Sequence, residues 1–269
     1  MVGRRRRRGA GTFPGFAGWF LAAALLFSSS VSSRSQDVLT VAGDSSLRNA
    51  LQELAQAWAD NTDDNKKVEL SISNMETLKG EVGKGAPWDV VILAGAEEAR
   101  QLTEQGKLDP QGQRKVARNE LVVFGKKALL KDEEPEWHDL LRNEWRRMAL
   151  GNPALTASGR YAQKAMESRD LWDRVKAEAR LAPTEALALD FARRNEVDGV
   201  FVFRTDLKGV TLDLYEIYPV DSKDHPPILY VAAAIKGGAK IALARDFVQF
   251  LVSEEAVPVW KKWGFSAGG

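Results

Sequence analysis

The chain has 269 residues, and its 38 lysines and arginines nearly balance its 37 aspartates and glutamates. It contains no cysteine, which excludes disulfides, thiolate metal sites and lipid attachment through cysteine. Hydrophobic residues make up 44% of the sequence, enough for one core or two ordinary lobes without crosslinks.

The first 36 residues predict a secretory signal peptide. Arg4–Arg8 are positively charged, residues 15–27 are apolar, and residues 28–35 are small and polar. The apolar run is shorter than the roughly 20 residues of a membrane-spanning helix. We expect cleavage between Ser33 and Asp37, which would release the mature chain into the periplasm. Retention of the segment as a membrane anchor is the alternative.

Loss of this segment changes the charge of the protein. Residues 1–36 contain six arginines and no acidic residue, so removing them leaves 32 basic residues against 37 acidic ones. The mature chain is therefore mildly acidic, with a net charge near −5. Such a surface gives no reason to expect nucleic acid or an anionic membrane as a partner.

Short apolar segments alternate with amphipathic segments from residue 38 onward. This alternation predicts an α/β fold whose sheets are mostly parallel and are covered by helices on both faces. The expected strands are Val38–Ala42, Val68–Ile72, Asp89–Leu93, Leu121–Phe124, Met148–Leu150, Gly199–Phe203 and Ile228–Ile235. The expected helices are Leu47–Asp60, Thr77–Lys84, Ala96–Glu104, Gly159–Ser168, Asp170–Ala177, Thr184–Asn195, Ala239–Ser253 and Ala256–Trp263.

Three loops in this order are candidates for a binding site. Ligands of open α/β sheets bind beyond the carboxyl ends of the strands, where helices begin. We therefore expect residues 44–46, 74–76 and 156–159 to lie together. In the first loop, Ser45 and Ser46 stand where the first N–H groups of a helix lack internal partners. They either cap the helix or bind an anion with hydroxyl and N–H groups, and both readings stay open.

Catalytic motifs are absent from the sequence. His138 and His225 are far apart, and neither has a second histidine at the spacing of a zinc site. The chain has no Gly-x-Ser-x-Gly, His-Glu-x-x-His or phosphate-loop motif. We therefore expect a protein that is not an enzyme, without cofactor or bound metal.

A series of short motifs occurs in the order typical of a known family. They are Leu39-Thr-Val with Ser46-Leu-x-Asn-Ala, Thr77-Leu78, Gly85-Ala-Pro-x-Asp89-Val-Val-Ile, Asn119-Glu-Leu-Val-Val, Gly151-Asn-Pro, Gly159-x-Tyr161-Ala, Arg194-Asn-Glu, Tyr218-Pro-x-Asp-Ser222 and Trp263-Gly-Phe265. With these motifs the chain resembles the periplasmic molybdate-binding proteins of ATP-driven importers from Val38 to Phe265. The resemblance implies a two-lobed fold of the type II periplasmic kind that closes on its ligand by a hinge motion.

The resemblance also implies domain boundaries and partners. A signal peptide would span residues 1–36, the first lobe residues 37–119 with 235–269, and the second lobe residues 120–234. The chain would cross between the lobes near Asn119–Leu121 and near Leu229–Ala234. The protein would be a monomer that delivers a small oxyanion, such as molybdate or tungstate, to the membrane permease of an importer.

In that family a tetrahedral oxyanion is held by hydroxyls and by backbone N–H groups at helix N-termini. Matched residue by residue, the family's donors fall on Ser46 beside Ser45, on Met75 beside Asn74, on Ser158 followed by Gly159 and Arg160, near Glu185, and on Phe203 followed by Arg204. These positions form the expected ligand site.

Two positions depart from the family pattern, because Met75 and Phe203 carry no hydroxyl. Asp44 and Glu76 also bring negative charge close to the expected site, which would oppose a dianion by several kcal/mol. We therefore expect weaker oxyanion binding than in a relative with the full donor set.

Two alternatives remain. The same scaffold could bind a different small anion, a carboxylate or a phosphonate, through Arg160 or Arg204. It could also be a divergent protein-interaction domain, in which case the cleft would be occluded or lined by acidic residues.

Overall fold

The computed structural model describes residues 38–61, 66–127, 136–141 and 147–268. The expected signal peptide and its cleavage site lie outside these residues. Residues 36–269 form one compact unit. Within the described part of the chain, every helix is too short or too polar to cross a membrane.

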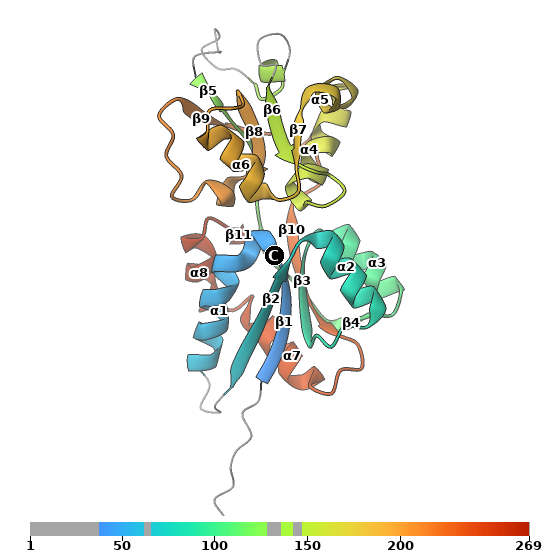
Figure 1. The fold of residues 1–269 in the computed structure, drawn as a ribbon. Coiled ribbons are helices and arrows are strands. Elements are labelled where there is room, and N and C mark those ends of the chain that lie inside the picture. The colour runs from blue at the N-terminus through green and yellow to red at the C-terminus, as the bar shows by residue number, and fades with distance from the viewer. Residues whose placement is uncertain (1–37, 62–65, 128–135, 142–146, 269) are drawn as a thin grey trace, which may run out of the picture. The chain divides into compact units, whose positions relative to one another are not determined.

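The first lobe is built on a six-stranded sheet with the order β11–β4–β10–β3–β1–β2 (Figure 1). Its strands are β1 (Val38–Asp44), β2 (Lys67–Ser73), β3 (Val90–Ala94), β4 (Leu108–Arg118), β10 (Leu229–Ile235) and β11 (Ser266–Ala267). The helices of this lobe are α1 (Arg48–Asp60), α2 (Met75–Lys84), α3 (Ala96–Glu104), α7 (Ile241–Phe250) and α8 (Ala256–Lys262), and the short η1 (Ser45–Leu47) precedes α1. All five residues of β3 are buried, as expected for a central strand covered on both faces.

The second lobe is built on a five-stranded sheet with the order β7–β6–β8–β5–β9. Its strands are β5 (Leu121–Lys126), β6 (Met148–Gly151), β7 (Arg180–Ala182), β8 (Gly199–Phe203) and β9 (Tyr215–Pro219). Its helices are α4 (Ala157–Glu167), α5 (Trp172–Glu178) and α6 (Glu185–Arg193), with the short helices η3 (Asp139–Leu141) and η4 (Arg204–Leu207). The chain therefore enters this lobe between β4 and β5, and returns to the first lobe between β9 and β10.

The expected α/β elements are all present. Each of the strands and helices predicted from apolar periodicity is found, with ends shifted by a few residues. The sheets are mixed rather than mostly parallel, because β10 runs antiparallel to both β3 and β4, and β5 runs antiparallel to both β8 and β9. Antiparallel neighbours arise because these strands follow a crossing between lobes instead of a βαβ connection.

No pattern of apolar residues in the sequence predicts the strand β4. It contains Pro110, Gly112 and several charged residues, and its buried positions do not alternate. Pairing with β10 along most of its length holds it in the sheet. The short strands β7, β9 and β11 were likewise not expected.

The strand β10 lies in the first lobe, although the expected domain boundary assigned most of it to the second lobe. This strand (orange in Figure 1) lies in the six-stranded sheet between β3 and β4. The return to the first lobe therefore precedes Leu229, whereas the expected boundary placed residues up to 234 in the second lobe. The apolar run Leu229–Ala234 is buried between its two neighbouring strands, and this burial accounts for its place.

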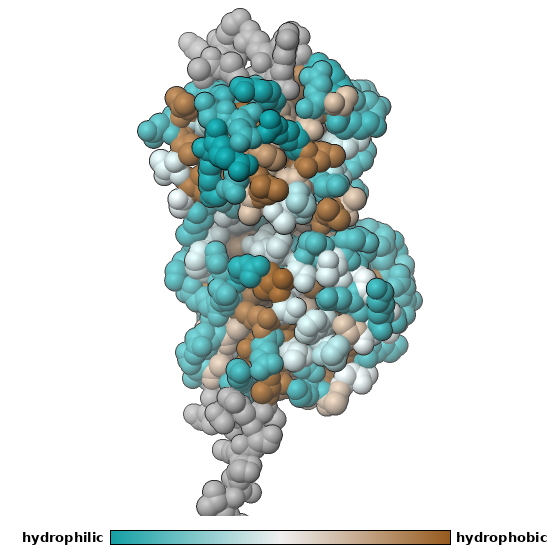
Figure 2. Space-filling view, viewed as in Figure 1, coloured by the Kyte–Doolittle hydropathy of each residue, from teal (hydrophilic) through white to brown (hydrophobic). Residues whose placement is uncertain are grey.

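The face drawn in Figure 2 is mostly hydrophilic, with hydrophobic side chains in a narrow column over the region of β1 and β2 and in small groups elsewhere. Among the described residues, the large hydrophobic side chains that are exposed belong to Leu181, Leu214, Ile217 and Val252. They are distributed over both lobes.

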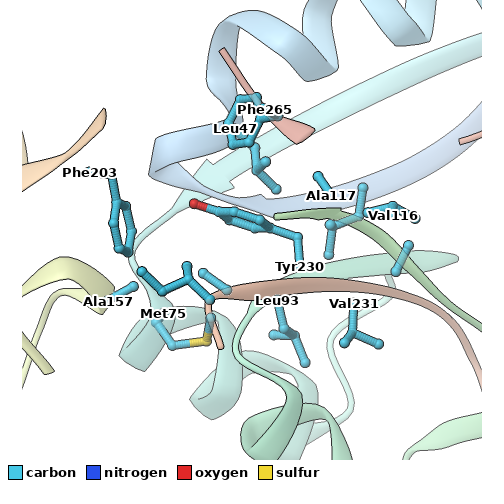
Figure 3. Packing of buried hydrophobic residues seen from close by; sticks show 14 of the residues in the cluster. Leu47, Met75, Leu93, Val116, Ala117, Ala157, Phe203, Tyr230, Val231 and Phe265 are labelled. Carbon is cyan, nitrogen blue, oxygen red and sulfur yellow. The ribbon is translucent and has the colours of Figure 1, made fainter. Parts of the chain in front are cut away.

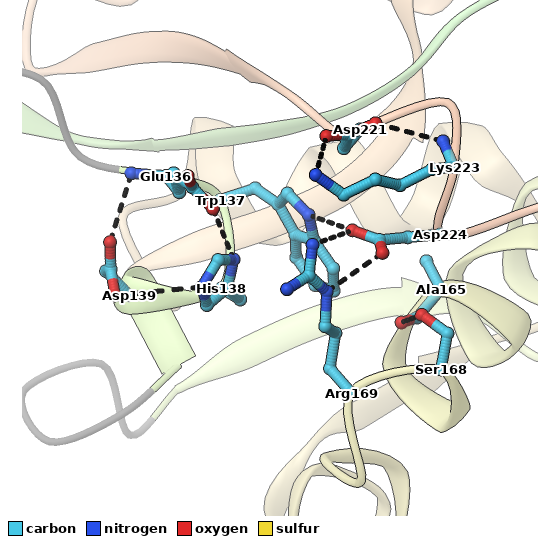
Figure 4. A network of polar contacts seen from close by, with 10 residues as sticks. All are labelled: Glu136, Trp137, His138, Asp139, Ala165, Ser168, Arg169, Asp221, Lys223 and Asp224. Atoms are coloured by element: carbon cyan, nitrogen blue, oxygen red, sulfur yellow. Dashed lines mark hydrogen bonds and ion pairs between the residues drawn. The ribbon is translucent and has the colours of Figure 1, made fainter.

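A buried ion pair links the loop after β9 to the end of α4 (Figure 4). Arg169 donates from Nε and Nη2 to the two carboxylate oxygens of Asp224, at 2.8 and 3.0 Å. Trp137 donates from Nε1 to the same carboxylate at 3.0 Å. Burial alone would raise the pKa of Asp224, but the bonds from Arg169 and Trp137 lower it below its usual value. The second lobe therefore depends on Asp224 being charged.

Replacing Asp224 with Asn should lower the free energy of unfolding by about 2–3 kcal/mol, because Arg169 loses its charge partner in a partly buried site. Chemical denaturation followed by fluorescence measures this loss. The control is Asp221→Asn, since the Asp221 carboxylate pairs with Lys223 at the surface and should contribute less than about 1 kcal/mol. Equal losses in the two variants would contradict the assignment.

Candidate functional site

The end of β1 carries a carboxylate that caps its own loop. Asp44 is 1% exposed and is the N-cap of η1. Its Oδ1 accepts hydrogen bonds from the backbone N–H of Ser46 at 3.1 Å and from the Ser46 hydroxyl at 2.6 Å. The N–H and hydroxyl of Ser46, two of the donors that the sequence offered to a ligand at this loop, are therefore bonded to Asp44.

A tyrosine hydroxyl connects this loop to both lobes. The hydroxyl oxygens of Ser46 and Tyr230 are 2.8 Å apart, and Tyr230 donates because the Ser46 proton points to Asp44. Asn119 donates from Nδ2 to the Tyr230 hydroxyl at 3.2 Å and to the Thr205 hydroxyl at 2.8 Å. Burial, with Asp44 nearby, raises the pKa of Tyr230 well above its usual value, so its proton is retained. Tyr230 lies on β10 and Thr205 in η4, so the network passes from the first lobe into the second.

A second carboxylate lies between the lobes. Glu185 is the first residue of α6 and is 7% exposed. The hydroxyl of Ser45, from the first lobe, lies 3.5 Å from its Oε2, and the hydroxyl of Ser158, from the second lobe, lies 3.4 Å from its Oε1. Two serines of the expected site therefore converge on one carboxylate.

A third carboxyl group, that of Asp206 in η4, completes an acidic cluster with Asp44 and Glu185. Its Oδ2 accepts a hydrogen bond from the backbone N–H of Phe203 at 3.0 Å. Burial, with Glu185 and Asp44 nearby, raises the pKa of Asp206 to about 8. Burial and the Glu185 charge likewise raise the pKa of Asp44 to about 6. The expected ligand site thus holds three acidic groups, as the protein-interaction alternative expects, and part of their charge is removed by protonation near neutral pH.

The two positions without hydroxyls are filled by apolar side chains. Met75 and Phe203 are fully buried and belong to the largest hydrophobic cluster, in which Figure 3 shows them near Ala157. The Phe203 ring also packs against Tyr161, with ring centroids 6.1 Å apart. They form a wall of the site and offer no side-chain donor.

Two other expected donors are used within the protein. Asn74 caps α2, because its Oδ1 accepts from the backbone N–H of Thr77 at 2.9 Å. The N–H of Gly159 donates to the hydroxyl of Thr156 at 3.1 Å. Thr156 thereby caps the start of α4. A Cβ atom on Gly159 would lie 2.1 Å from the carbonyl oxygen of Gly151, so only glycine allows α4 to approach β6 this closely. Gly159 therefore sets the position of its neighbour Ser158.

The two candidate arginines lie in different surroundings. Arg160 forms an ion pair with Glu98 of α3, with Nε 3.3 Å from Oε1. Its Nη2 is buried and, among the described residues, has no hydrogen-bond partner. It lines a pocket of about 340 Å³ together with Tyr161, Lys164 and residues at the start of α3. Arg204 instead pairs with Glu120 at the surface.

Sequence reasoning missed Asp206, Tyr230, Asn119 and Thr205 as members of the site. Thr205 and Asp206 follow β8 directly, so the rule that sites form at the carboxyl ends of strands could have found them. Tyr230 lies within an apolar strand, where nothing in the sequence indicates a polar role. Across the described ranges, no group of three or more histidines, aspartates or glutamates is placed to hold a metal ion.

Comparison with known proteins identifies the family of this chain. A family model described as bacterial extracellular solute-binding protein matches residues 39–266. The chain belongs to this family. The expectation of a binding protein rather than an enzyme is therefore confirmed.

Individual proteins are similar to this chain over nearly its whole length. The molybdate-binding protein ModA of Haemophilus influenzae is 30% identical over 92% of this chain and 95% of its own length. The periplasmic molybdate-binding protein of Azotobacter vinelandii has a TM-score of 0.73 at 22% identity, covering 86% of this chain and all of that one. A periplasmic thiamin-binding protein has a TM-score of 0.74 at 16% identity, covering 88% of this chain and 85% of that one. The two solved structures confirm the two-lobed periplasmic fold.

The acidic cluster should make the fold more stable in mild acid. A carboxyl group whose pKa is raised in the folded state binds more protons there, so stability falls as pH rises through that pKa. For Asp206, with a folded pKa of about 8, we expect the free energy of unfolding to decrease by about 3 kcal/mol from about pH 5.5 to about pH 8.

Urea denaturation at the two pH values measures this decrease. Asp206→Asn should remove most of it, whereas Asp190→Asn, at an exposed carboxylate of α6, should leave it unchanged. The same decrease in Asp206→Asn as in the wild type would refute the role of this carboxyl group.

Proposed function

We propose that this chain is the exported binding component of an ATP-driven importer and that it captures a small oxyanion of the molybdate and tungstate class between its lobes. The observation that carries this proposal is the convergence of the Ser45 and Ser158 hydroxyls, one from each lobe, on the Glu185 carboxylate. Donors from two lobes that converge on one anionic group are what an oxyanion site requires. The molybdate-binding relatives support the choice of ligand class.

Export to the periplasm, delivery to a membrane permease and a monomeric state form part of the same proposal. The charged, apolar and small-residue order of residues 1–36 supports export. The mildly acidic composition of the remaining chain supports a small-molecule ligand rather than nucleic acid.

The site is less favourable to a dianion than a site built only of neutral donors. Met75 and Phe203 contribute no hydroxyl, and the carboxyl groups of Asp44, Glu185 and Asp206 lie close by. Each ionised carboxylate near a bound dianion opposes it by several kcal/mol at intermediate dielectric. Binding should therefore be weaker than nanomolar at neutral pH.

Titration calorimetry with molybdate, tungstate and sulfate tests the proposal. We expect binding of at least one of these anions, and Ser158→Ala should weaken it by about tenfold or more because a hydroxyl donor to the anion is lost. The control is Ser168→Ala, at the end of the same helix, whose hydroxyl donates to the carbonyl of Ala165 instead. Nanomolar molybdate binding would contradict the expected weakening, and no binding of any anion would refute the proposed function.

A second candidate ligand is a small carboxylate or phosphonate bound by Arg160. The observation that favours it is the buried Nη2 of Arg160, which has no partner among the described residues and lies beside a pocket that Tyr161 and Lys164 also line. A carboxylate would complete the hydrogen bonding of this guanidinium.

A thermal-shift screen of small carboxylates and phosphonates tests this candidate. A stabilising compound should lose its effect in Arg160→Ala and keep it in Arg204→Ala, because Arg204 pairs with Glu120 at the surface. Equal loss in both variants would contradict a role for Arg160. No shift with any anion would favour the protein-interaction alternative.

A further inference from the structure

We propose that Glu185 is a built-in occupant of the anion site: its carboxylate binds the two serine hydroxyls in the absence of ligand, and an incoming anion must displace it. Glu185 would then set both the affinity of the site and the closure of the empty protein. This inference rests on the proposed function, because it identifies what regulates that same site.

The local structure of α6 leaves the Glu185 carboxylate available for this role. The N-cap of α6 is Thr184, whose hydroxyl accepts a hydrogen bond from the backbone N–H of Leu187 at 3.2 Å. The helix end is thus capped by its neighbour, and the Glu185 side chain is not needed there. It lies instead between Ser45 and Ser158, with 7% of the residue exposed.

The contacts of this carboxylate span the two lobes. Ser45 follows β1 of the first lobe, whereas Ser158 and Glu185 both belong to the second. Each of its oxygens contacts one hydroxyl, at 3.5 and 3.4 Å, which are long distances for hydrogen bonds to a charged acceptor. Such contacts hold the carboxylate in place weakly enough for a ligand with more acceptor oxygens to replace it.

The charges around Glu185 favour this exchange over simple addition of a ligand. Asp44 and Asp206 face it from the end of β1 and from η4, and Arg160 is a cation that faces Asp44. An anion that entered while Glu185 stayed in place would meet all three carboxyl groups. If the Glu185 side chain leaves, the negative charge nearest to the two serine hydroxyls leaves with it.

Removal of the carboxylate should therefore increase anion affinity. We expect Glu185→Ala to bind molybdate, tungstate or sulfate at least about tenfold more tightly than the wild type at neutral pH. Glu185→Gln keeps the size of the side chain and loses its charge, so its gain should be smaller. The matched control is Glu178→Ala, at an exposed carboxylate of α5 in the same lobe, which should bind as the wild type does. Calorimetric titration of the four purified proteins measures these affinities.

A second readout does not depend on an anion. Small-angle X-ray scattering without ligand should show a larger radius of gyration for Glu185→Ala than for the wild type, because the contact between Ser45 and the second lobe is lost. Glu178→Ala should leave the radius of gyration unchanged. If Glu185→Ala fails to fold, Glu185→Gln is compared with the wild type in its place.

The two readouts separate the two proposals. Opening of Glu185→Ala without binding of any anion would support the closing role of Glu185 and refute the proposed function. Anion binding by the wild type, with neither tighter binding nor opening in the Glu185 variants, would overturn the role of Glu185 and leave the proposed function standing. Neither binding nor opening would overturn both.

Discussion

The hydroxyl group of Tyr230 is the contact on which the arrangement around the cleft depends. It donates to Ser46 in η1 and accepts from Asn119, which also donates to Thr205 in the second lobe. Both crossings between lobes thus meet at one fully buried oxygen, since Asn119 lies on the first crossing and Tyr230 follows the second. The edge-on packing of its ring against Phe265 fixes the side chain from the other side. The Ser46 loop is therefore connected to both crossing segments by a continuous chain of hydrogen bonds.

The carboxyl groups of the cleft explain why this site differs from one made only of neutral donors. Burial of an ionised carboxylate is unfavourable unless donors surround it. Asp44 has the hydroxyl and N–H of Ser46, and Asp206 has the N–H of Phe203, so each acidic group uses a donor near the place expected for the ligand. The donors near the expected ligand position are thus already hydrogen-bonded to carboxylates of the protein itself. Ligand binding then replaces one set of hydrogen bonds with another.

Apolar periodicity was sufficient to predict most of the fold. Less of the site could be predicted, because the sequence does not reveal the direction in which each side chain points. The expected strands and helices depend on local patterns that the structure retains, whereas β4, with Pro110 and Gly112, is held by its partner β10. The rule for strand ends predicted that the loops of Ser45 and Ser158 lie together, and both hydroxyls do contact Glu185. Nothing local indicates that Glu185 reaches Ser45, because 140 positions separate them in the sequence. The sequence likewise gives no sign that Asp44 turns back onto Ser46.

The close contact of Gly159 with Gly151 has a consequence for how such a protein changes over evolutionary time. Because a backbone approach fixes the start of α4 against β6, the position of Ser158 is set by the backbone at this point rather than by the side chains that border the site. A substitution at Glu185 can therefore alter the ligand site while this contact persists, whereas Met75 and Phe203 are also core residues whose replacement affects stability. New specificities are then separated by a few mutations at loop ends rather than by a new fold.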